Sequence, residues 1–408
     1  MTVSSDASKR KPGLPTTAAP AAPAAPAAAQ QGSRAVMAYG CETLDQADSH
    51  HGMTLANIAR KVAWIGGQPF AGGYAAPAAG RPAPYLVPAQ TLVGHELAAS
   101  LGVQGEDDLF GGVVPYAFVA TKAITHGLVE PGAAAPRGWS EAFVRRVVGA
   151  TLPGFTAFSL GDARTAALRL LTLGPVRLKD TGGVGGLGQR VVDGEAALEE
   201  ALAALAPEEV ERDGLVVERD LRAPQTFSVG KVVLAGLEAS YCGTQGLTEN
   251  NRGQKVYGGS TLTVVRGGFD ALLQHPFDAR ILAAVRAAMV YHEAALACYG
   301  EGGGMVLSRC NYDVAFGAPA GGANDGQMLG GVLEQSWRVG GATGAELAAL
   351  AALRDDPRRT RVVASTREVY GNDVRVPDDA EIYYQGEDRH VGPLTKYARL
   401  EPESDGNA

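Results

Sequence analysis

A run of glycines between two short apolar strands limits what this chain can be more than any other feature of its sequence. The segment reads PVRLKDTGGVGGLGQRVV, and we expect strands at Val176–Lys179 and Arg190–Val192. The glycines between the two strands are Gly182, Gly183, Gly185, Gly186 and Gly188. Because glycine has no Cβ, successive backbone N–H groups can turn toward one point. Such a nest binds anions and suits nucleotide phosphates.

Lys179 ends the first of these strands and supplies a cation beside the glycines. The loop is not a Walker A motif, because no Gly-Lys-Ser/Thr sequence follows and the next element is a strand rather than a helix. A flap between two strands, as in protein kinases, is the closer mechanical analogy. The glycines alone leave open a second interpretation, a plain hairpin without a ligand.

Two strand-like segments further along carry acidic residues. In SRCNYDVAF, Asp313 alternates with apolar neighbours, and in GVLEQSWRVGGA, Glu334, Ser336 and Arg338 share one strand face by a period of two. Carboxylate oxygens are preferred ligands of Mg²⁺, and the guanidinium fork matches phosphate oxygens. We therefore expect these four residues to form one surface that holds a metal ion and phosphate groups. This surface is called the metal–phosphate wall below, and it consists of Asp313, Glu334, Ser336 and Arg338. The alternative is a solvated strand face with an ordinary Glu–Arg pair.

The order of these segments resembles that of ATP-grasp enzymes over about residues 110 to 345, most closely the biotin carboxylases and related carboxylate–amine ligases. VATKAITHGL places Lys122 where that family has a phosphate-contacting lysine, and GLVVERDL places Glu218 at the family's adenine-reading hinge. The resemblance implies that ATP is bound by Lys122, Lys179, the five glycines and Glu218. It also implies Mg²⁺ (or Mn²⁺) at Asp313, Glu334 and Ser336, and a catalytic Arg338.

The resemblance further implies an ADP-forming ligase that activates a carboxylate as an acyl phosphate for attack by an amine. The family usually has Asn at the position of Ser336, and a neutral hydroxyl is a poorer metal ligand than an amide carbonyl. One alternative is therefore a weakly active or non-catalytic ATP-binding protein. Another is carboxylase-like chemistry, although the chain has no visible biotinyl-carrier segment.

The fold class that we expect is α/β (α+β), with an ATP-grasp architecture of several parts. These are a disordered Pro/Ala-rich tail (1–33), a small N-terminal α/β domain (34–118), a central flap domain (119–240), a C-terminal metal-bearing domain (241–354) and an extension (355–408) without an assigned role.

The N-terminal domain is expected from alternating strand and helix patterns. Apolar runs at Ala35–Tyr39 and Tyr85–Val87 predict buried strands, and helical spacing predicts helices at Thr54–Ile65 and Leu92–Leu101. The first helix should end at Gly66-Gly67. Strands that alternate with helices favour a parallel sheet.

Charge and composition limit the partners. The net charge of −8 over 408 residues argues against nucleic acid as a main partner. The sequence has no run of eighteen uninterrupted apolar residues, so we expect no membrane span. The four cysteines are scattered, which favours a reducing, cytoplasmic compartment and argues against a zinc site. We expect small-molecule carboxylate and amine substrates, and a homodimer is compatible with the sequence.

Three further polar groups have two interpretations each. His50-His51 is either a metal-chelating pair or part of a surface loop, and we expect the loop because adjacent residues on a loop seldom chelate one metal. The polar segment ENNR, followed by Lys255, is expected in a loop over 243–259 that either reaches the acceptor substrate or is plain surface. His126 either lines the nucleotide cleft or caps a turn.

Overall fold

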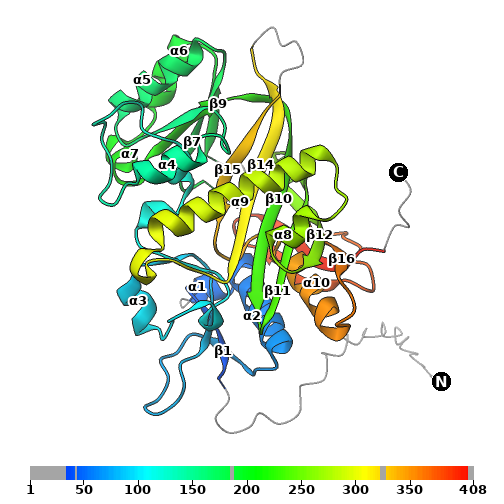
Figure 1. Cartoon of the computed structure of the whole chain (residues 1–408). Coiled ribbons are helices and arrows are strands. Elements are labelled where there is room, and N and C mark those ends of the chain that lie inside the picture. Colours follow the sequence, from blue (N-terminus) through cyan, green and yellow to red (C-terminus); the bar gives the residue numbers. More distant parts are fainter. Residues whose placement is uncertain (1–33, 42–43, 184–187, 322–327, 403–408) are drawn as a thin grey trace, which may run out of the picture.

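The computed structural model describes residues 34–41, 44–183, 188–321 and 328–402, which form four β-sheets (Figure 1). The expected tail at 1–33 lies outside these residues, as do Gly185 and Gly186 of the glycine run.

The N-terminal sheet is parallel, as predicted. Its strand order is β2-β1-β3, with β1 at Val36–Tyr39, β2 at Phe70–Gly73 and β3 at Tyr85–Pro88. Helix α2 (His50–Gly66) connects β1 to β2, and the short helix α1 (Leu44–Ala47) precedes it. The helix ends where Gly67 adopts a φ of 63°, as the glycine pair predicted.

The helix predicted at Leu92–Leu101 is wrong in its first turn. Leu92–Val93 forms strand β4, Gly94 follows with a φ of 93°, and helix α3 covers only His95–Ser100. Strand β4 belongs to a second small sheet of order β13-β5-β4, with β5 at Gly112–Val114 and β13 at Val306–Leu307. A glycine at positive φ interrupts the helical path that the apolar spacing suggested.

The central part is an antiparallel sheet of order β6-β9-β7-β8. Its strands are β6 (Gly154–Ala157), β7 (Val176–Asp180), β8 (Gln189–Val192) and β9 (Leu215–Arg219). Helices pack against it through a core of alanine, leucine and valine side chains. They are α5 (Leu160–Leu171), α6 (Glu195–Ala203) and α7 (Pro207–Asp213), and α4 (Glu141–Val147) precedes the sheet.

The largest sheet has eight strands in the order β15-β14-β10-β11-β12-β16-β18-β17. The strands from the middle of the chain are β10 (Leu221–Leu234), β11 (Leu237–Glu249), β12 (Lys255–Arg266), β14 (Arg309–Pro319) and β15 (Leu329–Ser336). The remaining three are β16 (Arg361–Tyr370), β17 (Glu381–Asp388) and β18 (Gly392–Leu400). The sheet therefore runs across the boundaries that we placed at 240/241 and 354/355.

Helices cover both faces of the large sheet. Helices α8 (Phe269–Leu273) and α9 (Ala279–Tyr299) pack on one face, and α2 and α10 (Thr343–Asp355) pack on the other. On β14, Tyr312 and Val314 face α9, so the alternating residues between them face the opposite side. The segment that leads into β6 of the central sheet contacts the large sheet, because Thr151 bridges to Val332 of β15.

Helix α9 is the one described helix that is long and apolar enough to cross a membrane by length and composition alone. Our expectation of no such segment rested on uninterrupted apolar runs, which α9 lacks. In the structure α9 lies across the large sheet, and Ala284, Ala288 and Tyr291 are fully buried there (Figure 1). The core helix of a folded domain has the same composition.

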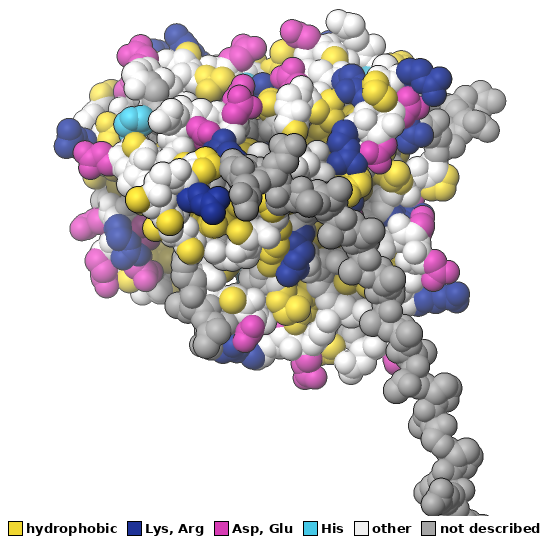
Figure 2. All heavy atoms as spheres, turned by 90° about the horizontal axis from the view of Figure 1, so that it is seen from below, with side chains coloured by type: hydrophobic (Ala, Val, Ile, Leu, Met, Phe, Trp, Pro, Cys, Tyr) yellow, Lys and Arg dark blue, Asp and Glu magenta, His cyan; other side chains and the backbone are white. Residues whose placement is uncertain are grey.

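Charged side chains are interspersed on the face seen in Figure 2. Acidic and basic groups alternate over that face with small apolar areas between them, and neither kind gathers into one patch.

Candidate functional site

The described part of the glycine flap is organised by Asp180, at the end of β7. Its carboxylate accepts from the N–H of Gly182 at 3.1 Å, and its carbonyl accepts from the N–H of Gly183 at 3.2 Å. Gly188 has a φ of 70°, and its carbonyl accepts from the N–H of Asp180 at 2.8 Å. Two N–H groups of the predicted nest are therefore occupied by Asp180 in this structure. We did not expect this role of Asp180 from the sequence.

Lys179 and Glu218 come from the adjacent strands β7 and β9. The ammonium of Lys179 lies 2.5 Å from Oε1 of Glu218, and Nε2 of His126 lies 3.1 Å from Oε2 of the same carboxylate. All three residues are at most 3% exposed. Burial alone would raise the pKa of Glu218, but Lys179 and His126 outweigh it and lower that pKa to about 2. The structure thus unites two predicted ATP-binding residues, with His126 as a third member.

Lys122 connects the flap to the metal–phosphate wall. It begins a short 3₁₀ helix (Lys122–Thr125), whose preceding residue Thr121 caps it. Its Nζ lies 2.8 Å from Oε2 of Glu334 and donates to the carbonyl of Gly183 at 2.6 Å. One ammonium therefore contacts both a flap residue and a predicted metal ligand, although the two are about 150 residues apart in the sequence.

Asp313 and Glu334 are direct cross-strand partners on β14 and β15. Oδ1 of Asp313 accepts from the side-chain amides of Asn311 at 2.9 Å and Gln245 at 2.8 Å. Burial and the charge of Glu334 together raise the pKa of Asp313 to about 7, despite these two donors. Two carboxylates that face each other across the ladder in this way are suited to share a divalent cation.

The rest of the wall is only partly as predicted. Ser336 is the last residue of β15 and lies opposite Asn311. Arg338 follows the strand, and its guanidinium donates to the carbonyl of Val339 at 2.7 Å. Burial and the charge of Arg309 lower the pKa of Arg338. Arg338 is therefore near the wall without a carboxylate hydrogen-bonded to it among the described residues.

The fit of this wall to Mg²⁺ rests on the chemistry of its donors. The described residues contain no group of three or more His, Cys, Asp and Glu side chains arranged to hold a metal. Mg²⁺ is commonly held by one or two carboxylates together with substrate phosphates and waters, so a larger protein cage is not needed. Asp313 and Glu334 meet that requirement, and Asn311 and Ser336 add neutral oxygens beside them.

A buried ion pair, Arg309–Glu346, contacts the backbone of the wall. Arg309 and Glu346 are 1% and 0% exposed, and the guanidinium contacts the two carboxylate oxygens at 3.0 and 2.5 Å. Arg309 also donates to the carbonyls of Ser336 and Arg338. We did not expect this ion pair from the sequence. The period-two pattern of SRCNYDVAF already places Arg309 on the face of Asp313, whereas no sequence signal indicates Glu346.

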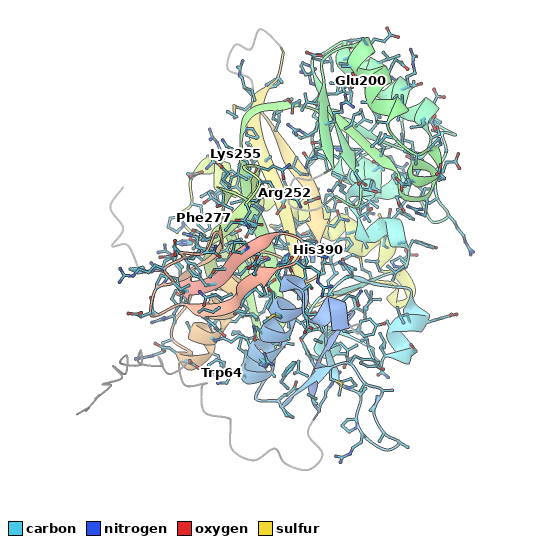
Figure 3. The ribbon with its side chains drawn as sticks, turned by 180° about the vertical axis from the view of Figure 1, so that it is seen from behind. Trp64, Glu200, Arg252, Lys255, Phe277 and His390 are labelled. Carbon is cyan, nitrogen blue, oxygen red and sulfur yellow. The ribbon has the colours of Figure 1, made fainter. Side chains whose placement is uncertain are left out.

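The polar segment after Gly243 is not a long loop, which corrects our expectation. Strand β11 continues to Glu249 and β12 starts at Lys255, so only a tight turn separates them. In that turn, Asn251 donates to the carbonyl of Val391 at 2.5 Å. Arg252, which is labelled together with His390 in Figure 3, donates to the carbonyl of His390 at 3.3 Å. Cross-strand pairing extends the hairpin, because the Gly and Thr residues that look loop-like themselves pair between β11 and β12.

His50 and His51 are also placed differently from our expectation. They lie in the first turn of α2, where Ser49 is the cap, rather than on a loop. The backbone N–H of His50 donates to Asp388 at 2.9 Å, and this bond ties α2 to the turn between β17 and β18. Burial and the charge of Lys396 lower the pKa of His50 to about 3.

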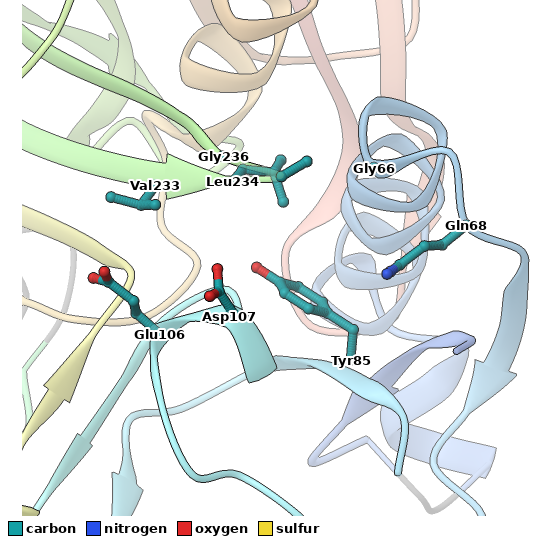
Figure 4. A pocket seen from close by; sticks show the side chains of 9 residues that line it. Gly66, Gln68, Tyr85, Glu106, Asp107, Val233, Leu234 and Gly236 are labelled. Atoms are coloured by element: carbon teal, nitrogen blue, oxygen red, sulfur yellow. The ribbon is translucent and has the colours of Figure 1, made fainter. Parts of the chain in front are cut away.

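Two cavities lie outside the wall. One, of about 260 Å³, is lined by Tyr85, Glu106 and Asp107 and by the β10–β11 turn (Figure 4). The other, of about 340 Å³, is mostly apolar and touches His126 from the side of α4. Neither is lined by Asp313, Glu334 or Arg338.

Comparisons with known proteins give a family and a fold. The sequence matches the family described as "Protein of unknown function (DUF3182)" over residues 38–398, and no curated protein matches it. A biotin carboxylase β,γ-ATP complex from Campylobacter jejuni superposes with a TM-score of 0.50 at 12% identity, covering 90% of this chain and 87% of that one. This match shows an ATP-grasp-like fold, as the sequence resemblance predicted.

Two further solved structures are similar at lower scores. D-alanyl-alanine synthetase A from Vibrio cholerae O1 biovar eltor has a TM-score of 0.44 at 11% identity, covering 76% of this chain and 90% of that one. The ATP-grasp ligase PsnB, complexed with minimal precursor, has a TM-score of 0.37 at 12% identity, with coverages of 79% and 97%.

Proposed function

Because the chain belongs to the DUF3182 family and has an ATP-grasp-like fold, we propose that it is an ATP- and Mg²⁺-dependent, ADP-forming carboxylate–amine ligase. The observation that carries the proposal is the position of Lys122, which contacts Gly183 of the flap and Glu334 of the wall. A cation at that junction, beside two carboxylates suited to Mg²⁺, is an arrangement that a polyphosphate would complete.

The reaction that we propose has two steps. A carboxylate oxygen of the acid attacks the γ-phosphorus of ATP, the bond from that phosphorus to the β–γ bridging oxygen breaks, and ADP leaves. The amine then attacks the acyl carbon of the acyl phosphate, loses a proton and displaces inorganic phosphate. Such transfer depends mainly on positioning and on neutralising charge.

Several charged residues of the site have a role in this reaction. Lys122 and Lys179 neutralise phosphate charge from the two sides of the flap, and Arg338 stabilises the charge on the transferred group. Glu218 holds the ammonium of Lys179 in place, because their ion pair is buried and 2.5 Å long. Bound Mg²⁺, held by Asp313 and Glu334, would supply additional positive charge at the β- and γ-phosphates.

Two observations favour a second candidate function, an ATP-binding protein with weak or no turnover. Ser336 offers a hydroxyl where an amide carbonyl would be the better metal ligand. The described flap N–H groups of Gly182 and Gly183 are also bonded to Asp180. A carboxylase-like activity would use the same ATP site with bicarbonate as the acid.

The test is the identity of the nucleotide product in a screen of amino acids, dicarboxylates, small peptides and bicarbonate. A ligase of this kind releases ADP and phosphate, and Glu334→Gln should abolish that release while leaving much of the ATP affinity. AMP and pyrophosphate as products would contradict the mechanism. ATP binding without any turnover across the screen would favour the second candidate.

A further inference from the structure

Asn311 has an unusual position for a residue that the sequence analysis left without a role. It lies on β14 two residues before Asp313, on the same strand face, and its partner across the ladder is Ser336 of β15. Asn311 is 7% exposed. Its other neighbour, on β10, is Gly230, where a Cβ would meet the ring of Tyr241 at 2.3 Å. The glycine thus leaves room for the Tyr241 hydroxyl beside the amide.

The two ends of the Asn311 amide meet different groups. Nδ2 donates to Oδ1 of Asp313 at 2.9 Å, and Oδ1 lies 3.1 Å from the hydroxyl of Tyr241. The same hydroxyl lies 2.7 Å from Oε1 of Glu346. A phenol has one proton, so it cannot donate to both acceptors at once. The shorter contact, to a charged carboxylate, is the stronger one.

Glu346 is held in place to receive that proton. Arg309 contacts both of its oxygens, and neither residue is more than 1% exposed. With the proton on the Glu346 side, the oxygen of Tyr241 presents a lone pair to Asn311. An amide rotated by 180° about χ2 would donate Nδ2–H to that lone pair and turn Oδ1 toward Asp313. This rotation brings two oxygens together, so it is favourable only when a cation lies between them.

The geometry points to Asn311 as the residue that supplies the neutral amide oxygen of the magnesium site at Asp313 and Glu334. The inference rests on the proposed function, because it assumes that these two carboxylates hold the metal. An amide carbonyl is a hard oxygen ligand with a longer reach than a serine hydroxyl. The wall therefore has its amide ligand on β14, across the ladder from Ser336. The serine at position 336 then does not deprive the metal of an amide oxygen.

The matched test uses Mn²⁺ as the probe and full-length protein without any substrate acid or amine. Mn²⁺ affinity is measured by the loss of the free-ion electron paramagnetic resonance signal, with and without a non-hydrolysable ATP analogue. We expect Asn311→Ser to weaken Mn²⁺ binding tenfold or more and Ser336→Asn to change it less than threefold. The double variant Asn311→Ser/Ser336→Asn moves the amide across the ladder and should recover most of the affinity.

The outcomes separate this inference from the proposed function. Wild-type affinity in a folded Asn311→Ser variant, together with lost affinity in Glu334→Gln, would overturn the role of Asn311 and leave the metal site standing. A folded double variant as weak as Asn311→Ser alone would also overturn it, since a purely structural role cannot be moved to position 336. If Asn311→Ser fails to fold, Asn311→Asp keeps the shape, and affinity below that of the wild type would overturn the inference. Unchanged Mn²⁺ binding in Glu334→Gln would reject the metal site itself.

Discussion

Lys179 and Glu218 form an ion pair of 2.5 Å between two residues that are 3% and 2% exposed. The pair joins the strand that starts the glycine flap to the strand that leads into the large sheet. Removing one partner of such a pair leaves a buried charge with too few partners, which is far more costly than the pair itself is stabilising. Its effects on binding and on stability can therefore be separated by mutation.

The first prediction concerns Lys179. Lys179→Ala should weaken ATP binding about tenfold or more, since a hydrogen bond to a charged group contributes roughly 1.5–3 kcal/mol. It should also destabilise the protein by about 3–5 kcal/mol, because Glu218 stays buried. Calorimetry and urea unfolding measure the two effects. The double variant Lys179→Ala/Glu218→Gln should recover stability but not affinity. Recovery of both would remove the Lys179 ammonium from the nucleotide site.

The second prediction concerns acid stability. The pKa of Glu218 is about 2 in the folded protein, against an ordinary value of 4.5. A carboxyl group with a lowered folded pKa stabilises the protein above its unfolded pKa and loses that contribution as the pH falls through the folded one. The difference corresponds to about 3 kcal/mol between pH 4.5 and 2. We expect the wild type to lose more stability than Glu218→Gln over this window, as measured by urea unfolding. Parallel losses would contradict the pKa.

The third prediction concerns Asp313 in protein free of divalent cations. Its pKa is raised from 3.8 to about 7, so the folded protein loses stability as the pH rises through this window and carries the whole penalty above pH 7. Asp313→Asn removes the penalty and should therefore raise the melting temperature at pH 8. Added Mg²⁺ and an ATP analogue should stabilise the wild type more than the variant. A variant less stable than the wild type at pH 8 would show that ionised Asp313 does not destabilise the protein.

The order of the site residues along the chain could be predicted from the sequence. The side-chain contacts that hold those residues in place could not. Period-two alternation placed Asp313 and Glu334 on strand faces, and the structure pairs them directly. Nothing local indicates that Gln245 reaches Asp313 or that Glu346, on a helix, reaches Arg309. These contacts depend on the order of strands in the large sheet, which is a long-range property of the fold.

The errors of local interpretation have a common cause. The polar hairpin around Asn251 looked like a loop because glycine, threonine and asparagine disfavour strands on average. Pairing across β11 and β12 overrides that preference, since each strand gains hydrogen bonds along its whole length. The helix expected from Leu92 failed for the same reason, because Leu92 and Val93 pair with β5, and Gly94 at positive φ then interrupts the helical path. Tertiary pairing decided both segments.

The last prediction concerns the buried pair Arg309–Glu346 beneath the wall. Glu346→Gln and Arg309→Met each leave a charged or polar group buried without its partner, and each should cost about 3–5 kcal/mol of stability in urea unfolding. The double variant Arg309→Met/Glu346→Leu should cost less than the sum of the two, because no charge remains buried. The exposed pair Arg164–Glu199 is the matched control, and Arg164→Met should leave the urea midpoint nearly unchanged.

In the double variant Arg309→Met/Glu346→Leu, we expect the effect on ligand binding to differ from the effect on stability. Arg309 donates to the carbonyls of Ser336 and Arg338, so a stable protein without it loses the contacts that hold this segment of the wall. We therefore expect Arg309→Met/Glu346→Leu to remain folded at 25 °C and yet to bind Mn²⁺ and ATP more weakly than the wild type. Calorimetry with the Arg164→Met control decides it. Unchanged affinities in the folded double variant would mean that the ion pair serves stability alone and that the wall is held by the strand ladder without it.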